Sequence, residues 1–239
     1  MQLLANNLSI GYGNDKIIFS DISFAAAEGD LIALLGVNGI GKSTLLRTIS
    51  GLQKSVSGRI LIEGKELQSL SVQERAKLIS IVLTERIFVD NISVKEFITL
   101  GRAPYTNWLG KLSQEDADEI ERVIAIMKIE KLQHQLFNRI SDGEKQKILI
   151  ARALCQQTPV IILDEPTAFL DFKNKKDILE LLSSIAKEMK KTVILSTHDI
   201  DAALAYCNKC WLMTEQKIFE EVYRTAAFKE EVSRKLLLT

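Results

Sequence analysis

Runs of apolar residues along the chain predict an α/β protein. Apolar and polar residues alternate over residues 3–35, which is typical of antiparallel strands, and this stretch ends in a continuous apolar run at residues 31–35. Two more uninterrupted runs, at residues 160–166 and 192–197, favour buried parallel strands. Residues 57–67 predict a further hairpin.

Apolar residues spaced three or four apart predict helices from about residue 71 to residue 155. Several of these segments begin at a serine, a residue that favours helix starts because its oxygen accepts a hydrogen bond from the first turn. In one of them, Ser113 and Asp116 match a capping box. The apolar face that follows is expected to pack in the core and comprises Ile120, Val123, Ile124 and Met127.

Composition narrows the classes of protein that fit. The 31 basic and 31 acidic residues leave a formal net charge of zero, so no overall charge attracts nucleic acid or an anionic membrane, and no nucleic-acid partner is expected. The first residues lack the basic and apolar regions of an ordinary signal peptide. No run approaches the ~18 to 20 apolar residues of a spanning helix. We therefore expect a soluble, cytoplasmic protein that reaches a membrane only by docking on a partner.

Two features allow alternative interpretations. Cys207 and Cys210 have a spacing seen in redox and metal sites, but no second pair exists, and buried thiols are the favoured interpretation for these residues and Cys155. Residues 101–110 form an aromatic loop around Tyr105 and Trp108 that either faces a partner or packs on its own helices.

A glycine-rich segment after the apolar run at residues 31–35 predicts a phosphate-binding loop. Gly36, Gly41, Lys42 and Ser43 match G-x-x-x-x-G-K-[ST], and helical spacing resumes directly afterwards. Glycines let consecutive N–H groups turn toward a phosphate, and the helix start adds its positive dipole end. A glycine-rich turn without a ligand is disfavoured because the flanking elements also fit. The predicted nucleotide-binding residues are Gly36, Val37, Asn38, Gly39, Ile40, Gly41, Lys42, Ser43 and Thr44.

Polar residues follow the two other buried strands. Asp164 and Glu165 end the run at residues 160–166, and His198 follows residues 192–197. Adjacent carboxylates at a buried strand end need a partner, which a phosphate-bound Mg²⁺ would supply. Because ligands collect beyond the carboxyl ends of parallel strands, we expect these residues to meet the phosphate loop. Tyr12, in an early turn, is either an ordinary surface aromatic or a base-stacking residue.

Taken in this order, the motifs resemble those of the ATP-binding-cassette (ABC) transporter ATPases across essentially the whole chain. GVNGIGKST is similar to the Walker A motif, ISDGEK to the signature motif, VIILDEP to Walker B, and residues 168–171 to the D-loop. The resemblance implies a P-loop NTPase core with a parallel sheet and an N-terminal antiparallel β subdomain. A helical subdomain would be inserted at about residues 85–155 of a single domain spanning residues 1–239.

The resemblance also implies roles for individual residues. Glu165, His198 and Lys42 would be catalytic: Glu165 polarises the attacking water, His198 contacts the γ-phosphate, and Lys42 binds the β- and γ-phosphates. Ser43 and Asp164 would hold Mg²⁺, and Tyr12 would stack on adenine. Thr84, with Glu85 beside it, stands where the family has a metal-linked glutamine and is a candidate contributor to the metal site.

The signature motif departs from the usual LSGGQ. Ser141 and Gly143 are kept, and Asp142 adds a carboxylate close by. By resemblance, two copies associate head to tail, and each ATP lies between one copy's Walker A and the signature of the other. The residues acting in trans are Ser141, Asp142, Gly143 and Glu144.

The segment LGRAPYTNWLG is similar to one found in the ATPases of importers for iron–siderophore complexes, haem and cobalamin. The resemblance thus implies an ATP hydrolase at the cytoplasmic face of the membrane, bound to transmembrane permease subunits and served indirectly by an extracytoplasmic substrate-binding protein. Two other classes stay open at this point. One is a soluble ABC ATPase acting on ribosomes or DNA, and the other is a P-loop kinase or a GTPase switch.

Overall fold

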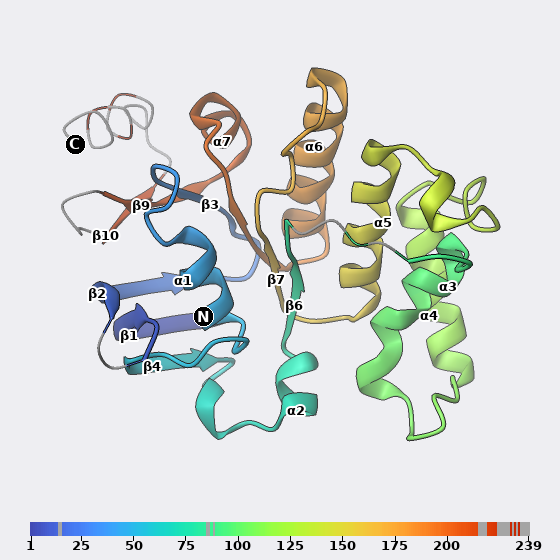
Figure 1. Ribbon diagram of the computed structural model, residues 1–239, viewed down its shortest axis with the longest axis horizontal. Helices are drawn as coiled ribbons and strands as arrows, with labels where there is room; N and C mark the ends of the chain where they lie inside the picture. Colours follow the sequence, from blue (N-terminus) through green and yellow to red (C-terminus); the bar gives the residue numbers. More distant parts are fainter. Residues whose placement is uncertain are drawn as a thin grey trace.

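The fold combines two β-sheets of different strand direction (Figure 1). The computed structural model describes residues 1–13, 16–84, 87, 89–214, 219–223, 230, 232 and 234. One sheet is antiparallel, with the strand order β2-β1-β4-β5. Its strands are β1 (Leu3–Gly11), β2 (Ile17–Ala26), β4 (Ser57–Ile62) and β5 (Lys65–Glu66).

The second sheet has the order β10-β9-β3-β8-β7-β6 and is parallel except for β10. Its strands are β3 (Leu31–Leu35), β6 (Ile79–Val82), β7 (Val160–Leu163), β8 (Thr192–Ser196), β9 (Lys209–Met213) and β10 (Phe219–Tyr223). Neighbouring parallel strands bring β3, β8 and β7 to a common carboxyl edge, which is where ligands gather in sheets of this kind.

Helices cover both faces of the second sheet. The α-helices are α1 (Lys42–Ile49), α2 (Val72–Ala76), α3 (Val94–Thr99), α4 (Gln114–Ile126), α5 (Asp142–Cys155), α6 (Phe172–Glu188) and α7 (Ile200–Tyr206), and the 3₁₀ helices are η1 (Leu67–Ser69), η2 (Leu100–Tyr105) and η3 (Phe137–Arg139). Helices α3, α4 and α5 lie together on the far side of β6 and β7 from the antiparallel sheet (Figure 1). No helix in the described part of the chain is long and apolar enough to cross a membrane.

Alternation along the buried strands divides the core into two clusters. Along β3, Ile32 and Leu34 join a cluster with the antiparallel sheet and α1, whereas Leu31, Ala33 and Leu35 join a cluster with the helices α3 to α7. Successive side chains of a strand point to opposite faces, so a strand buried on both faces is apolar throughout. The chain therefore buries the parallel sheet between two layers and leaves its carboxyl edge for polar residues.

This architecture confirms the predicted fold class, and two details differ from expectation. Strand β6, whose run ISIV pairs with β7, interrupts the stretch of helical spacing just before Thr84, where the resemblance implies a strand. The strands β9 and β10 were not foreseen, because KCWLM is short and follows directly on a helix. Part of the predicted aromatic loop is the 3₁₀ helix η2.

Candidate functional site

The glycine-rich loop curls around the ammonium group of Lys42. The Lys42 Nζ donates hydrogen bonds to the carbonyl oxygens of Gly36, at 2.8 Å, and Val37, at 3.2 Å. A Cβ at position 36 would lie 2.6 Å from the carbonyl oxygen of Met213, so only glycine lets the loop pass β9 this closely. At Gly41 the backbone φ of 119° is one that side-chain-bearing residues rarely adopt. Local sequence thus shapes a tight loop directly before α1.

Helix α1 differs at its start from the helices of the α3–α5 layer. The N-cap residue of α1, Gly41, makes no side-chain capping bond, and the first turn of α1, which the structure describes in full, holds no acidic residue. By contrast, α3, α4 and α5 each begin with a serine and a carboxylate in a capping box. The first N–H groups of a helix need partners and carry a positive partial charge. The start of α1 is therefore suited to an anion.

Lys42 is buried, which sets the electrostatics of the loop. Burial lowers the pKa of the Lys42 ammonium, and the negative charges of Glu165 and Asp164 partly oppose this, leaving a net lowering. A phosphate placed here would stabilise the charged form of Lys42 in the same way as these carboxylates do. The loop and the two carboxylates thus belong to one electrostatic site.

The carboxylates lie at the end of β7, between the ends of its two neighbouring strands. Asp164 is 6% exposed, and its Oδ1 accepts a hydrogen bond of 2.6 Å from the hydroxyl of Ser196 on β8. The same hydroxyl accepts the backbone N–H of Glu165 at 2.8 Å. From the β6 side, the Thr84 hydroxyl donates to the Asp164 carbonyl oxygen at 2.8 Å. Sequence reasoning missed Ser196, although it is a polar residue at the end of an apolar run.

His198, which follows β8, meets Glu165 across the strand ends. Its Nδ1 lies 3.1 Å from Glu165 Oε2, and its side chain is 63% exposed. Glu165 has a left-handed backbone, with φ 50°, which is uncommon for a residue with a Cβ and recurs at functional sites. The structure therefore brings together the carboxylates of Asp164 and Glu165 with Lys42 and His198, beyond the ends of the neighbouring strands β3, β8 and β7.

The remaining predicted residues lie at different distances from this centre. The Tyr12 hydroxyl is 3.4 Å from Thr44 Oγ1 on α1, and the residue is 60% exposed, so Tyr12 stands beside the phosphate loop at the surface. Its stacking role stays a prediction. Thr84 directs its hydroxyl proton to a backbone carbonyl, and its role at a metal also stays a prediction. Glu85 lies outside the described residues.

The signature residues form the start of α5, which lies beyond β6 and β7 from α1 (Figure 1). Glu144 Oε2 accepts hydrogen bonds from the N–H of Ser141, at 2.8 Å, and from its hydroxyl, at 2.7 Å. Asp142 forms an ion pair of 3.5 Å with Lys145. A Cβ at Gly143 would lie 2.9 Å from the side chain of Asn174, so glycine permits α6 to approach here.

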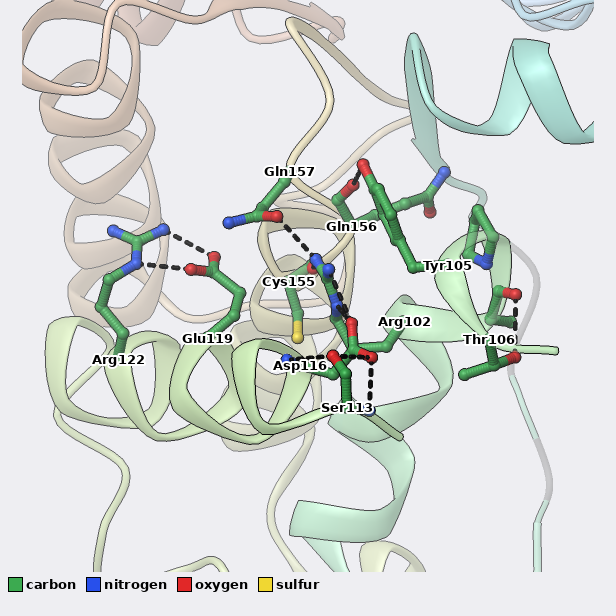
Figure 2. A network of polar contacts seen from close by, with 12 residues as sticks. Arg102, Tyr105, Thr106, Ser113, Asp116, Glu119, Arg122, Cys155, Gln156 and Gln157 are labelled. Carbon is green, nitrogen blue, oxygen red and sulfur yellow. Dashed lines mark hydrogen bonds and ion pairs between the residues drawn. The ribbon is translucent and has the colours of Figure 1, made fainter. Parts of the chain in front are cut away.

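The buried side chain of Arg102 links elements of the helical layer formed by α3, α4 and α5. Figure 2 shows that Arg102 of η2 contacts α4, α5 and the turn after α5: it bonds Asp116 of α4 at 2.8 Å, and its Nη1 donates to the carbonyl of Cys155 and to the side chain of Gln157, each also at 2.8 Å. Tyr105 packs over the Arg102 guanidinium and donates to the Gln156 carbonyl. Sequence reasoning missed Arg102, because no local pattern marks its distant partners.

This network answers the question left open for residues 101–110. Tyr105 packs inward on its own helices, so the packing alternative holds for it, whereas Trp108 is 92% exposed and its contact with a partner stays a prediction. Cys155, Cys207 and Cys210 are buried thiols. Burial raises the pKa of the Cys155 and Cys210 thiols to about 12, which keeps them protonated and unreactive.

A strand–loop–helix that wraps a lysine, with carboxylates at the neighbouring strand end, defines a P-loop NTPase. The ABC transporter family matches residues 19–168, and the chain belongs to this family. It is thus an ATPase that hydrolyses ATP for transport. ATPases of this family dimerise and associate with permease subunits.

Individual relatives cover nearly the whole chain. An uncharacterized ABC transporter ATP-binding protein of Methanocaldococcus jannaschii is 37% identical over 98% of this chain and 80% of its own length. A probable siderophore transport system ATP-binding protein of Bacillus subtilis is 33% identical over 90% of this chain and 78% of its own. Among solved structures, a dimeric bacterial ABC transporter cassette is 26% identical, with a TM-score of 0.78 over 93% of this chain and 99% of its own.

Proposed function

We propose that this chain is the energy-coupling ATPase of an importer for iron–siderophore complexes, with haem and cobalamin as the alternative cargoes. The observation that carries the cargo class is the similarity to the siderophore transport ATPase of Bacillus subtilis over 90% of the chain. The η2 segment, LGRAPY, lies within that similarity and supports the same class of importer. Cargo would be bound by a substrate-binding protein outside the membrane and by permease subunits.

Residues of the phosphate loop would bind the nucleotide. Lys42, now bonded to the carbonyls of Gly36 and Val37, would turn its ammonium to the β- and γ-phosphates, and the loop amides and the start of α1 would complete the cradle. Tyr12, beside Thr44, would stack on the adenine.

The residues around the loop fit a Mg²⁺ ion. The exposed Ser43 hydroxyl, in the first turn of α1, and the Asp164 carboxylate are hard oxygen ligands of the kind Mg²⁺ takes together with substrate phosphates and water. When bound, the ion would neutralise charge on the phosphate oxygens. Asp164 is buried beside Lys42, so its negative charge is already part of this site.

Water attack on the γ-phosphate depends on positioning and on charge stabilisation. Glu165 would accept a hydrogen bond from the attacking water and orient it, while His198 would contact the γ-phosphate. The 3.1 Å contact between these two side chains supports a shared task at the reacting centre. Ser141 to Glu144 would reach the ATP held by a second copy, so that ATP closes a head-to-tail dimer and hydrolysis releases it.

The chain would work at the cytoplasmic face of the membrane, docked on the permease. Uptake measurements in the native host test this proposal. Deleting the gene should abolish uptake of radiolabelled ferric siderophore, and wild-type protein should restore it, whereas Lys42→Ala should not, because the phosphates lose their main charged contact. If the deletion leaves siderophore uptake unchanged but abolishes uptake of haem or cobalamin, the cargo is that compound instead. If uptake of all three compounds is unchanged, the importer proposal is wrong.

A further inference from the structure

Ser196 is a buried hydroxyl placed between the two carboxylate residues at the end of β7. It is the last residue of β8 and is 0% exposed. Its hydroxyl donates to Asp164 Oδ1 at 2.6 Å and accepts the N–H of Glu165 at 2.8 Å. One hydroxyl therefore satisfies a side chain of one residue and the backbone of the next.

We propose that Ser196 is a positioning residue for ATP hydrolysis, which sets the orientation of the Asp164 carboxylate and the backbone of Glu165 together. The inference rests on the proposed roles of these two residues at Mg²⁺ and at the attacking water. Ser196 itself touches neither group, so it acts through Asp164 and Glu165.

The backbone of Glu165 shows why such a support is needed. Its φ of 50° is a left-handed conformation, which is uncommon for a residue with a Cβ and costs free energy that local hydrogen bonds can offset. The Glu165 carbonyl accepts the N–H of Ala168 at 3.0 Å, and its N–H is bound by Ser196, so both ends of the residue are held. This conformation directs the side chain to His198.

The donor side of the hydroxyl acts on Asp164. By donating a hydrogen bond to Oδ1, the Ser196 hydroxyl fixes the plane of the Asp164 carboxylate and stabilises its negative charge in a buried position. Thr84 holds the same residue from the β6 side, but only by its backbone carbonyl. Ser196 therefore bonds the carboxylate that is proposed to face the metal, whereas Thr84 bonds the backbone of the same residue.

The test compares Ser196→Ala with Ser80→Ala as a matched control. Ser80 is also a buried serine of this sheet, on β6, but it bonds the Thr158 hydroxyl at 3.0 Å and pairs with Ile161, away from the carboxylates. Two quantities are measured in the purified full chain: the Mg²⁺ concentration that half-saturates binding of a fluorescent ADP, and kcat and KM for ATP. Thermal unfolding is followed in parallel to establish that each variant is folded.

Ser196→Ala should raise the Mg²⁺ requirement and lower kcat by about 10- to 100-fold, as loss of a residue that orients a metal ligand does, with little change in KM. Nucleotide binding without Mg²⁺ should be unchanged. Ser196→Thr, which keeps the hydroxyl, should recover most of both quantities, and Ser80→Ala should match wild type.

Different outcomes separate this inference from the proposed function. If Ser196→Ala matches Ser80→Ala in both its Mg²⁺ requirement and its kcat, or if kcat falls with no change in Mg²⁺ requirement, Ser196 has no positioning role at the metal. If Ser196→Ala is unfolded, Ser196→Thr decides: a folded threonine variant with wild-type values supports the inference, and one with a raised KM alone overturns it. Wild-type protein that binds ADP without any response to Mg²⁺ would instead overturn the proposed metal site.

Discussion

Glu144 carries a negative charge at the position where the usual signature has a neutral glutamine. Its carboxylate accepts hydrogen bonds from the hydroxyl and from the backbone N–H of Ser141. Both hydrogen bonds lower the pKa of Glu144, and the one from the hydroxyl has the larger effect. The carboxylate thus remains ionised at the helix start that is proposed to face the phosphate of a second copy. A phosphate arriving there meets a negative charge and competes for the same hydroxyl.

We expect Glu144→Gln to strengthen ATP-dependent association of two copies about fivefold, because one like charge near a surface contributes on the order of 1 kcal/mol. Glutamine can still accept the capping hydrogen bonds. Sedimentation at several ATP concentrations measures the effect. The matched control is Glu74→Gln, which alters the equivalent capping box with Ser71 at the start of α2. Equal shifts in both variants would show that helix capping, and not charge at the signature, is responsible.

At the scale of elements, the Arg102 network joins η2 and α4 to the end of α5 (Figure 2). The Arg102–Asp116 pair is buried, with side chains 5% and 4% exposed, and each charge depends on the other. Gln156, next to the network, bonds the carbonyls of Ala76 and Ile79, so the same helix end is also tied to the parallel sheet. The network thus sets how the helical layer sits on the core.

Arg102→Ala should lower the free energy of unfolding by about 3 to 5 kcal/mol, because it leaves the buried Asp116 charge unpaired. Urea unfolding measures this. Lys95→Ala is the matched control: it breaks the exposed Lys95–Glu121 pair of the same layer and should cost no more than about 1 kcal/mol. A small effect of Arg102→Ala would mean that Ser113 alone satisfies Asp116.

Acid should weaken the same network. Burial raises the pKa of Asp116, but hydrogen bonds from Ser113 and Arg102 outweigh it, and the net pKa is lowered. A carboxyl with a lowered folded pKa contributes stability above its unfolded pKa of about 3.9, and this is lost as the pH falls through the folded pKa. The stability difference between wild type and Arg102→Ala should therefore shrink below about pH 4.

At the scale of the whole molecule, helix α5, whose start carries the signature residues, lies across β6 and β7 from α1 (Figure 1). This separation supports the proposal that the start of α5 serves the nucleotide of a second copy. Two copies in head-to-tail contact satisfy this geometry, and the solved cassette of similar fold is a dimer.

Glu165→Gln should bind ATP, hydrolyse it on the order of 10² to 10⁴ times more slowly than wild type, and accumulate a dimer on gel filtration, because ATP remains in the interface. The wild-type rate should rise more than linearly with protein concentration and change again when permease subunits are added. Near-normal turnover by Glu165→Gln would remove Glu165 from its role. A wild-type rate strictly proportional to concentration would place a complete site in one copy.

Much of the site could be predicted from local sequence. The spacing from Gly36 to Ser43 defines a loop that needs glycine at positions 36 and 41, and continuous apolar runs mark β3, β7 and β8 with their polar ends. Because parallel strands share a carboxyl edge, these runs also predicted that Glu165 and His198 would lie together, and they are 3.1 Å apart. The capping boxes of α4 and α5 follow from residues three apart.

The sequence by itself therefore determined the elements, their order and the residues at their ends, because hydrophobic periodicity, glycine and capping chemistry act over a few residues. Only the tertiary structure decided which distant groups share a bond. Ser196 and Thr84 meet Asp164 because β7 lies between β8 and β6, and Arg102 meets Cys155 across 53 positions of the chain. Such contacts depend on strand order and on helix packing, which no single segment encodes.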